Sequence, residues 1–235
     1  MIVLGIETSG RRGSVALVRN EQVLASRRSP EGASHARDVM PAIDQLLRNA
    51  DIRKEEVNGV TVSEGPGSFT GLRIGITCAK TLAYLLHWEA AAVPSLEVLV
   101  ENVNPDVIGV QTACPLRDAR RSTVYGTLFR REGDAWEAQT GVMVKSPKEM
   151  ASQLPPDTLV FGSGARAYPE TFGPDNEHGL LTPERDMEEG RAEAVARLGA
   201  RLIARGETTP PMQLEPRYYR RTAAEERANS PDRDS

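Results

Sequence analysis

Closely spaced metal ligands and disulfide partners are scarce in this sequence. Its 235 residues include two cysteines, Cys78 and Cys114, and three histidines that stand far apart, His35, His87 and His178. Two cysteines are too few for a disulfide framework, so buried thiols in a reducing compartment are the expected state. Because zinc and iron sites use ligands at short, regular spacings, no metal site made by this chain alone is expected.

Long apolar runs and an excess of positive charge are also missing. No apolar stretch approaches the length of a membrane span, and the first residues lack the basic stretch and apolar core of a signal peptide, so none is expected. The formal net charge is −4, so no overall basic field attracts nucleic acid. The composition, 39% hydrophobic and 26% charged, is typical of a globular protein with one large domain or two small ones. We therefore expect a cytoplasmic protein with no membrane contact.

The sequence does contain a glycine-rich stretch, Glu64–Gly75, between an expected strand and an expected helix. The strand is a β-branched run, Val57–Val62, and the helix carries apolar residues at helical spacing. Ser68 and Thr70 both suit the N-cap of that helix. The pattern predicts a tight strand-to-helix corner. Its glycine spacing fits neither the dinucleotide fingerprint nor the P-loop, and Pro66 stands where a nucleophile elbow needs glycine, so no catalytic residue is predicted.

The rest of the chain alternates between expected strands and helices. In the first hundred residues we expect strands at Ile2–Ser9, Gly13–Arg19, Gln22–Arg27, Val57–Val62 and Ala90–Pro94, and helices at Ala36–Leu47, at Arg73–Leu86 and from Ser95. Further on we expect strands at Val107–Gln111, Thr123–Arg130, Gln139–Lys145 and Thr158–Phe161, a helix at Pro147–Gln153, and the longest helix at Met187–Arg205. This order predicts an α/β fold. We divide it into an N-terminal subdomain (residues 1–104), a smaller C-terminal subdomain (105–221) and a disordered tail (222–235).

Two acidic residues near strand ends suggest a ligand site. Glu7 closes the first strand and Asp118 follows a later one. Because ligands of open α/β sheets bind outside the carboxyl ends of strands, Glu7 with Ser14 could form one half of a phosphate-and-magnesium site and Asp118 the other. Ion pairs with neighbouring arginines would explain the same residues.

The segment Leu214–Arg221 combines two tyrosines with three arginines. Tyrosine and arginine are both enriched in contact surfaces, so the segment could dock a partner or RNA. It could equally be an arm that packs back on its own domain, and the sequence leaves both interpretations open.

The glycine-rich stretch, read as Gly65-Pro66-Gly67-Ser68-Phe69-Thr70-Gly71-Leu72-Arg73-Ile74-Gly75, resembles the hallmark of the bacterial TsaB (YeaZ) family. Shorter matches occur in the right order at Ile6-Glu7-Thr8-Ser9, Ser34-His35, Pro94-Ser95-Leu96-Glu97, Asp118-Ala119-Arg120-Arg121 with Val124-Tyr125, and Pro216-x-Tyr218-x-Arg220. The resemblance covers nearly the whole chain to Arg220. It implies two ribonuclease-H-like subdomains of the actin, Hsp70 and sugar-kinase (ASKHA) type.

In function, the resemblance implies a non-catalytic scaffold subunit of the complex that forms threonylcarbamoyladenosine beside the tRNA anticodon. Such a subunit pairs with a TsaD-type catalytic subunit, recruits a TsaE-type ATPase and meets tRNA through the complex. TsaD carries a metal-binding histidine pair, which this chain lacks. No cofactor is expected on this chain alone, with ATP and magnesium only at a complex interface. A homodimer could cover the partner surface when the partner is absent.

By the same analogy, the two helices of the first subdomain and the glycine corner should form the partner interface. The expected interface residues are Gly65, Pro66, Gly67, Ser68, Phe69, Thr70, Gly71, Leu72, Arg73, Gly75, Ile76, Ala79, Ala83, Val39 and Ile43. Glu7, Ser14 and Asp118 would then be a vestigial nucleotide site; many relatives carry Asp where this chain has Glu7. The alternatives are an active ATP-hydrolysing or phosphotransfer enzyme that uses Glu7 and Asp118, and a glycoprotease-like peptidase.

Overall fold

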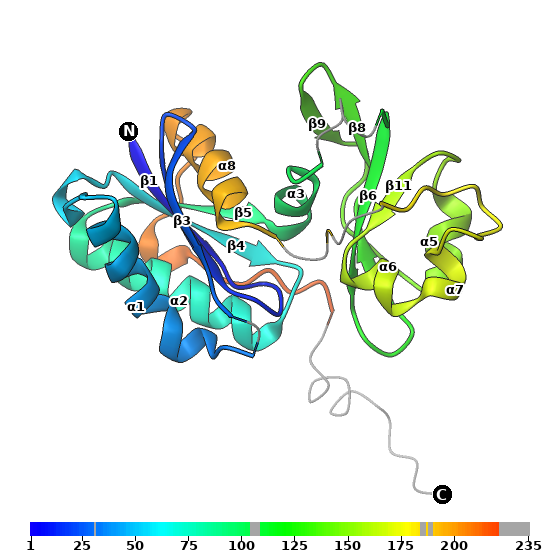
Figure 1. Cartoon of the computed structure of the whole chain (residues 1–235), viewed down its shortest axis with the longest axis horizontal. Coiled ribbons are helices and arrows are strands. Elements are labelled where there is room, and N and C mark those ends of the chain that lie inside the picture. Colours follow the sequence, from blue (N-terminus) through cyan, green and yellow to red (C-terminus); the bar gives the residue numbers. More distant parts are fainter. Residues whose placement is uncertain (31, 104–108, 184–186, 188–189, 221–235) are drawn as a thin grey trace, which may run out of the picture.

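The structure is a computed structural model that describes all residues except 31, 104–108, 184–186, 188–189 and 221–235. The chain forms two lobes that lie side by side, each built on its own β-sheet (Figure 1). No helix within the described residues is long and apolar enough to cross a membrane.

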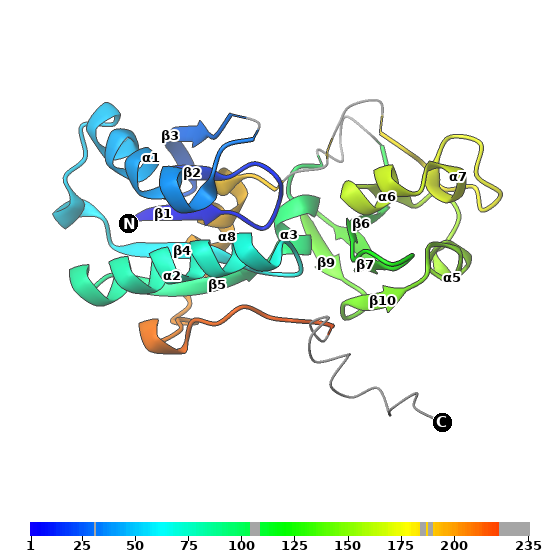
Figure 2. The ribbon, with the colours of Figure 1, turned by 90° about the horizontal axis from the view of Figure 1, so that it is seen from below.

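Lobe 1 is built on a five-stranded mixed sheet with the order β3-β2-β1-β4-β5. Its strands are β1 (Ile2–Glu7), β2 (Ser14–Arg19), β3 (Gln22–Arg28), β4 (Gly59–Gly65) and β5 (Glu89–Pro94). The first three are antiparallel, and β4 and β5 extend β1 in parallel, as the sequence predicts. The helices α1 (His35–Asn49) and α2 (Phe69–Leu86) cover one face of this sheet, and α8 (Ala192–Ala204) covers the other (Figures 1 and 2).

Both faces of the central strand β1 are buried, and its alternate residues pack against helices on opposite faces of the sheet. Leu4 and Ile6 pack in the cluster that includes residues of α1 and α2, whereas Val3 packs with Ala196 and Ala200 of α8. Successive side chains of a strand point to opposite faces, so a strand covered on both sides is apolar throughout. This explains why β1 reads as a continuous apolar run that ends in Glu7.

Lobe 2 is built on a six-stranded sheet of mostly shorter strands with the order β10-β7-β6-β8-β9, in which β11 pairs in parallel with β6. Its strands are β6 (Thr112–Asp118), β7 (Val124–Gly126), β8 (Phe129–Glu132), β9 (Ala135–Ala138), β10 (Met143–Lys145) and β11 (Leu159–Phe161). The helix α3 (Ser95–Val100) packs with one side of the sheet. The helices α5 (Pro147–Gln153) and α7 (Pro169–Phe172) pack with the other, beside α6 (Ser163–Ala167).

Several expectations for the second half are wrong in detail. The strand expected at Val107–Gln111 begins instead at Thr112, and residues 107 and 108 lie outside the described residues. The strand expected at Thr123–Arg130 is split into β7 and β8, and β9 was not foreseen. The last helix, expected at Met187–Arg205, spans only Ala192–Ala204, and the longest helix is α2.

The division at residue 105 needs a correction as well. The helix α8 packs on the sheet of lobe 1, because its small residues fit against β1, β2 and β4. After α8, a short 3-10 helix, η2 (Pro211–Gln213), lies against α2. The expected C-terminal subdomain, residues 105–221, therefore contains a lobe 2 segment followed by segments of lobe 1. The expected tail at 222–235 lies outside the described residues.

Candidate functional site

The glycine corner joins β4 to α2 and packs against the loop that follows β1. Gly65 has φ +126°, a left-handed conformation that favours glycine. The Ser68 Oγ accepts a hydrogen bond from the Gly71 N–H at 3.2 Å and caps α2, and the Ser68 N–H donates to the Ser9 carbonyl at 2.8 Å. A Cβ on Gly71 would overlap the Thr8 carbonyl oxygen. The predicted strand-to-helix corner is confirmed, and its glycine at 71 permits close approach of two backbones.

Most of the apolar side chains expected at a partner interface are in the core of lobe 1. Leu72, Ile76, Ala79 and Ala83 of α2 are at most 3% exposed, and Val39 and Ile43 of α1 are at most 7% exposed. An amphipathic helix buries its apolar stripe against its own sheet, so the stripe read from the sequence is the inner face. Direct partner contact by these six side chains is therefore a wrong expectation, and Gly71 and Gly75 are likewise packed against Thr8.

The outer face of α1 and α2 exposes other apolar residues. Among the described residues nine large apolar or aromatic side chains are exposed, and six of them lie on α1, α2, η2 and the segment after it. They are Met40, Phe69, Tyr84, Leu85, Met212 and Tyr218. The Met40 sulfur lies 3.3 Å from the Cys78 sulfur, which joins α1 to α2 at this face. We call Met40, Tyr84 and Leu85 the outer helix face.

The Glu7 carboxylate is buried and already has partners. Glu7 is 1% exposed, and its carboxylate accepts hydrogen bonds from the Ser63 hydroxyl and from the Ser9 N–H (2.6 Å). Ser14 lies opposite Glu7 in the hairpin, and its hydroxyl accepts a hydrogen bond from the Ala192 N–H at 3.0 Å. Glu7 and Ser14 thus join β1, β2, β4 and α8. Asp118 lies in lobe 2 at the end of β6 and pairs with Arg120 at 3.4 Å. The structure brings Glu7 and Ser14 together in lobe 1, but Asp118 lies apart from them in lobe 2.

A cleft of about 810 Å³ opens between the two lobes. Lobe 1 contributes its two loops, at residues 9–11 and 67–69, and lobe 2 contributes the end of β6, Tyr125 and α6. Its charged lining residues are Arg11, Arg117, Arg120, Arg166 and Asp118. Arg117 is 4% exposed and donates from Nη2 to the Ser9 hydroxyl at 2.9 Å, which ties the two lobes at the floor of the cleft. Neither Glu7 nor Ser14 belongs to the described lining.

The C-terminal segment, residues 214–220, is an extended arm that runs from lobe 1 to lobe 2 (Figure 2). The Arg217 N–H donates to the Glu64 carbonyl at 2.7 Å, and its guanidinium pairs with the Glu64 carboxylate at 3.3 Å. Burial raises the pKa of Glu64, and the charge of Arg217 opposes that rise. The Arg220 guanidinium donates to the Ala119 and Arg120 carbonyls of lobe 2 at 3.4 Å. Of the two interpretations of this segment, the structure shows the packed arm.

Comparisons with known proteins identify the family. A family model described as tRNA N6-adenosine threonylcarbamoyltransferase (TsaD) matches residues 8–172. A tRNA threonylcarbamoyladenosine biosynthesis protein TsaB from Bacillus subtilis is 34% identical over 165 residues, which are 69% of this chain and 71% of that protein. The chain belongs to the TsaB family. The TsaB protein of Escherichia coli is 27% identical over 95% of this chain and 96% of its own length.

A solved structure of YeaZ from Pseudomonas aeruginosa has a TM-score of 0.79 and 26% identity, and the match covers 92% of this chain and 99% of that one. The expected ASKHA fold with two ribonuclease-H-like lobes is thereby confirmed for this TsaB-family chain. The glycine corner and the α1–α2 layer thus belong to a fold shared over nearly the whole length of the chain.

Sequence reasoning missed the cleft arginines as a group. Arg11, Arg117 and Arg166 come from a hairpin loop, a buried strand and a short helix that are far apart in the sequence. Of the cleft arginines, only Arg120 stands in a stretch that the sequence singled out, Asp118-Ala119-Arg120-Arg121. A short-range pattern does not report that three distant segments meet in space.

Proposed function

We propose that this TsaB-family chain is the non-catalytic scaffold subunit of the complex that makes threonylcarbamoyladenosine in tRNA. It pairs with a TsaD-type catalytic subunit and recruits a TsaE-type ATPase, and it acts in the cytoplasm. It needs no cofactor of its own; ATP and magnesium would bind only at an interface of the complex. The support is the family membership together with the outer helix face.

The observation that carries the proposal is the exposure of this face. Met40 is 48% exposed, Tyr84 62% and Leu85 66%, although all three are large apolar or aromatic side chains. Met40 lies on α1, and Tyr84 and Leu85 lie on the adjacent helix α2. Exposed apolar side chains on neighbouring elements mark contact surfaces, and their burial by a partner supplies the hydrophobic part of association. Alpha-helices that pack side by side offer a rigid surface that a partner's helices can meet through ridges and grooves. A second copy of the chain would cover the same face when the partner is absent.

The position of Glu7 supports a scaffold over an ATP-hydrolysing enzyme. A magnesium–nucleotide site needs carboxylates that face the phosphates. Glu7 instead holds Ser63 and the Ser9 N–H inside lobe 1, and Asp118 is engaged with Arg120. The carboxylates therefore stabilise the chain rather than offer ligands side by side.

Reconstitution tests this function. A TsaD-type subunit, a TsaE-type ATPase, the enzyme that supplies threonylcarbamoyl-adenylate and a tRNA that reads a codon beginning with A are combined with and without this chain. We expect tRNA modification only when the chain is present, and no modification or ATP hydrolysis by the chain alone. Equal modification without the chain would overturn the proposal.

A further inference from the structure

The interlobe cleft has a charge opposite to that of the whole molecule. The chain has a formal net charge of −4, yet its described cleft lining holds four arginines and one aspartate. That aspartate, Asp118, is paired with Arg120. Clustered charge of one sign in a cleft between low-dielectric walls raises the local concentration of the opposite charge. The cleft therefore suits an anionic ligand, although the chain as a whole does not.

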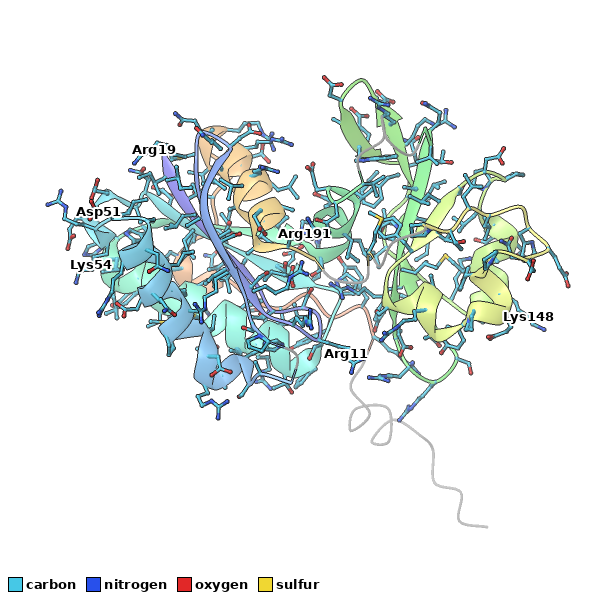
Figure 3. The ribbon with its side chains drawn as sticks, in the orientation of Figure 1. Arg11, Arg19, Asp51, Lys54, Lys148 and Arg191 are labelled. Atoms are coloured by element: carbon cyan, nitrogen blue, oxygen red, sulfur yellow. The ribbon has the colours of Figure 1, made fainter. Side chains whose placement is uncertain are left out.

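The positive groups come from both lobes. Arg11 extends from lobe 1 toward the region between the lobes (Figure 3), and Arg120 and Arg166 come from lobe 2. The first turn of α2, at Ser68 and Phe69, opens on the same cleft, and the N-terminus of an 18-residue helix adds partial positive charge there. Charge distributed in this way suits a ligand with several phosphates along a chain better than one with a single compact group.

Aromatic rings lie on the same cleft and continue beyond its rim. Phe69 and Tyr125 line the cleft, and each contacts a tyrosine of the arm: Phe69 stacks on Tyr218 with centroids 5.1 Å apart, and Tyr125 lies 6.3 Å from Tyr219. Phe69 is 43% exposed and Tyr218 47%. The Arg73 guanidinium lies over the Phe69 ring, 5.1 Å from its centroid. Arginines and half-exposed aromatic rings are thus contiguous over the cleft and the arm.

We propose that this cleft and the aromatic rim of Phe69 and Tyr218 bind a single-stranded segment of RNA directly. Arg11, Arg120 and Arg166 contact backbone phosphates, and an unpaired base stacks on the outer face of Tyr218, which is 47% exposed, because Tyr218 and Arg73 already lie over the Phe69 ring. Proteins recognise single-stranded RNA by this combination of a basic groove and stacking platforms. The inference rests on the proposed function, since it makes the scaffold subunit a direct contributor to the binding of the tRNA substrate.

RNA is favoured over a small nucleotide by the position of the aromatic rings. Phe69 lines the cleft, whereas its stacking partner Tyr218 lies on the arm and outside the described lining, so a ligand confined to the cleft would contact only one ring of the pair. The carboxylate of Asp118 also accepts a hydrogen bond from the Arg120 N–H at 2.8 Å, so it stays engaged when the Arg120 guanidinium contacts a phosphate, and it does not offer a free carboxylate for the magnesium that accompanies nucleoside triphosphates.

The test is fluorescence anisotropy of the full-length chain with a labelled RNA stem–loop that carries an unpaired loop, and with the same stem closed as a duplex. The variant is the triple substitution Arg11→Gln, Arg120→Gln and Arg166→Gln, which leaves the buried Arg117 in place. Its matched control is Arg19→Gln, Lys54→Gln and Lys148→Gln, which removes the same charge at exposed positions away from the cleft (Figure 3). Thermal melts establish that both triple variants are folded, and Arg166→Gln alone replaces the triple variant if that one unfolds.

We expect the chain to bind the stem–loop more tightly than the duplex, with binding that weakens as salt rises. The cleft variant should lose at least tenfold in affinity, and its salt slope should fall by about 2, since each phosphate contact contributes about 0.7 in a single strand. The control should change affinity less than threefold. Tyr218→Leu should weaken loop binding severalfold, whereas Tyr218→Phe should preserve it.

Three outcomes would overturn the inference: no salt-dependent RNA binding by the chain, equal loss in the cleft and control variants, or saturable binding of ATP or inorganic triphosphate in the cleft without RNA binding. These results are separate from the reconstitution. A chain that is required for modification but does not bind RNA keeps the scaffold role and loses the RNA contact.

Discussion

The ring of Phe69, in the first turn of α2, stacks on the ring of Tyr218 in the C-terminal arm, with centroids 5.1 Å apart and planes 26° from parallel. The two residues are separated by most of the chain, so the contact attaches the arm to the glycine corner. It also leaves both rings half exposed at the edge of the interlobe cleft. The contact therefore bears on stability as well as on the proposed RNA surface.

This contact predicts a measurable coupling. Stacked aromatic pairs contribute about 0.5–1.5 kcal/mol beyond the burial of their area. In a double-mutant cycle of Phe69→Leu and Tyr218→Leu, followed by urea unfolding, we expect a coupling free energy in that range. Tyr84→Leu, in place of Tyr218→Leu, is the control, since Tyr84 is exposed elsewhere on α2. Additive effects of Phe69→Leu and Tyr218→Leu would show that the stack contributes nothing.

The glycine corner predicts a position-specific cost of a single methyl group. In Gly71→Ala the new Cβ would overlap the Thr8 carbonyl oxygen, so either the loop or α2 must shift. We expect a loss of about 1–3 kcal/mol in the free energy of unfolding, at roughly 2–4 °C in Tm per kcal/mol for a chain of this size. Gly141→Ala is the matched control, because no neighbouring atom lies within 4 Å of its Cβ position. Equal Tm values for the two variants would contradict the close packing.

The outer helix face predicts the effect of one charge on assembly. Leu85→Glu places a carboxylate in the middle of the proposed contact, where it would have to be desolvated without a partner. We expect at least a tenfold loss of affinity for a TsaD-type subunit, measured by calorimetry, with an unchanged Tm because Leu85 is 66% exposed. Leu181→Glu changes an exposed leucine of lobe 2 and should leave pairing intact. Unchanged affinity in Leu85→Glu would show that the partner binds another surface.

The environment of Glu64 predicts the sign of a pH effect. Burial raises its pKa above the ordinary value of 4.5, so the folded state retains its proton to a higher pH than the unfolded state does. Stability from this group is present below pH 4.5 and is lost as pH rises through the raised folded pKa. We expect Glu64→Gln to gain stability relative to the wild type across that window, measured by urea unfolding at several pH values.

Glu149 provides the control of opposite sign. Hydrogen bonds from the Ser146 hydroxyl and backbone at the start of α5 lower the pKa of Glu149, so its contribution is present at neutral pH and is lost on acidification. Glu149→Gln should therefore lose stability relative to the wild type as pH rises from acid to neutral. The same direction of change in Glu64→Gln and Glu149→Gln would contradict the assignment.

The burial of the two thiols predicts that both cysteines are alkylated slowly in the folded protein. Burial raises the pKa of Cys78 to about 11 and that of Cys114 to about 12. Because the thiolate is the reactive form, iodoacetamide at pH 8 should modify both cysteines much more slowly in the native chain than in urea. Mass spectrometry of the time course distinguishes the two sites. Rapid labelling of native Cys78 would show that the contact between α1 and α2 opens readily.

The order of strands and helices in the first hundred residues could be predicted from the sequence because local signals there agree. The turn at Asn20-Glu21 has two positive φ angles, and Gly65 ends β4 where the glycine pattern begins. Hydrophobic period, turn chemistry and capping point to the same boundaries, so local reasoning suffices. The turn of the chain from β4 into α2 at the glycine corner could be predicted for the same reason, because the glycine pattern and the Ser68 cap indicate the same boundary.

What the sequence could not supply is the partner of each apolar face. The stripe with Ile76 and Ala79 identifies a helix with a buried side, but only the structure shows that its own sheet fills that side. The expected placement of the last helix in the C-terminal subdomain was wrong for the same reason, since Ala196 and Ala200 would suit either sheet by size alone. The cleft is formed by loops, strand ends and a short helix that are far apart in the sequence, so no local sequence pattern reports it.

The return of α8 to the first sheet has a consequence for synthesis. The strand β1 leaves the ribosome long before α8, yet Val3 gains its cover from Ala196 and Ala200 only when these residues have emerged. The strands of lobe 2, between Thr112 and Phe161, are contiguous and are complete well before then. We expect lobe 2 to acquire its packing first, while the face of the lobe 1 sheet that α8 will cover is still exposed to solvent. A nascent chain that stalls before residue 192 would thus expose apolar strands and become a substrate for chaperones.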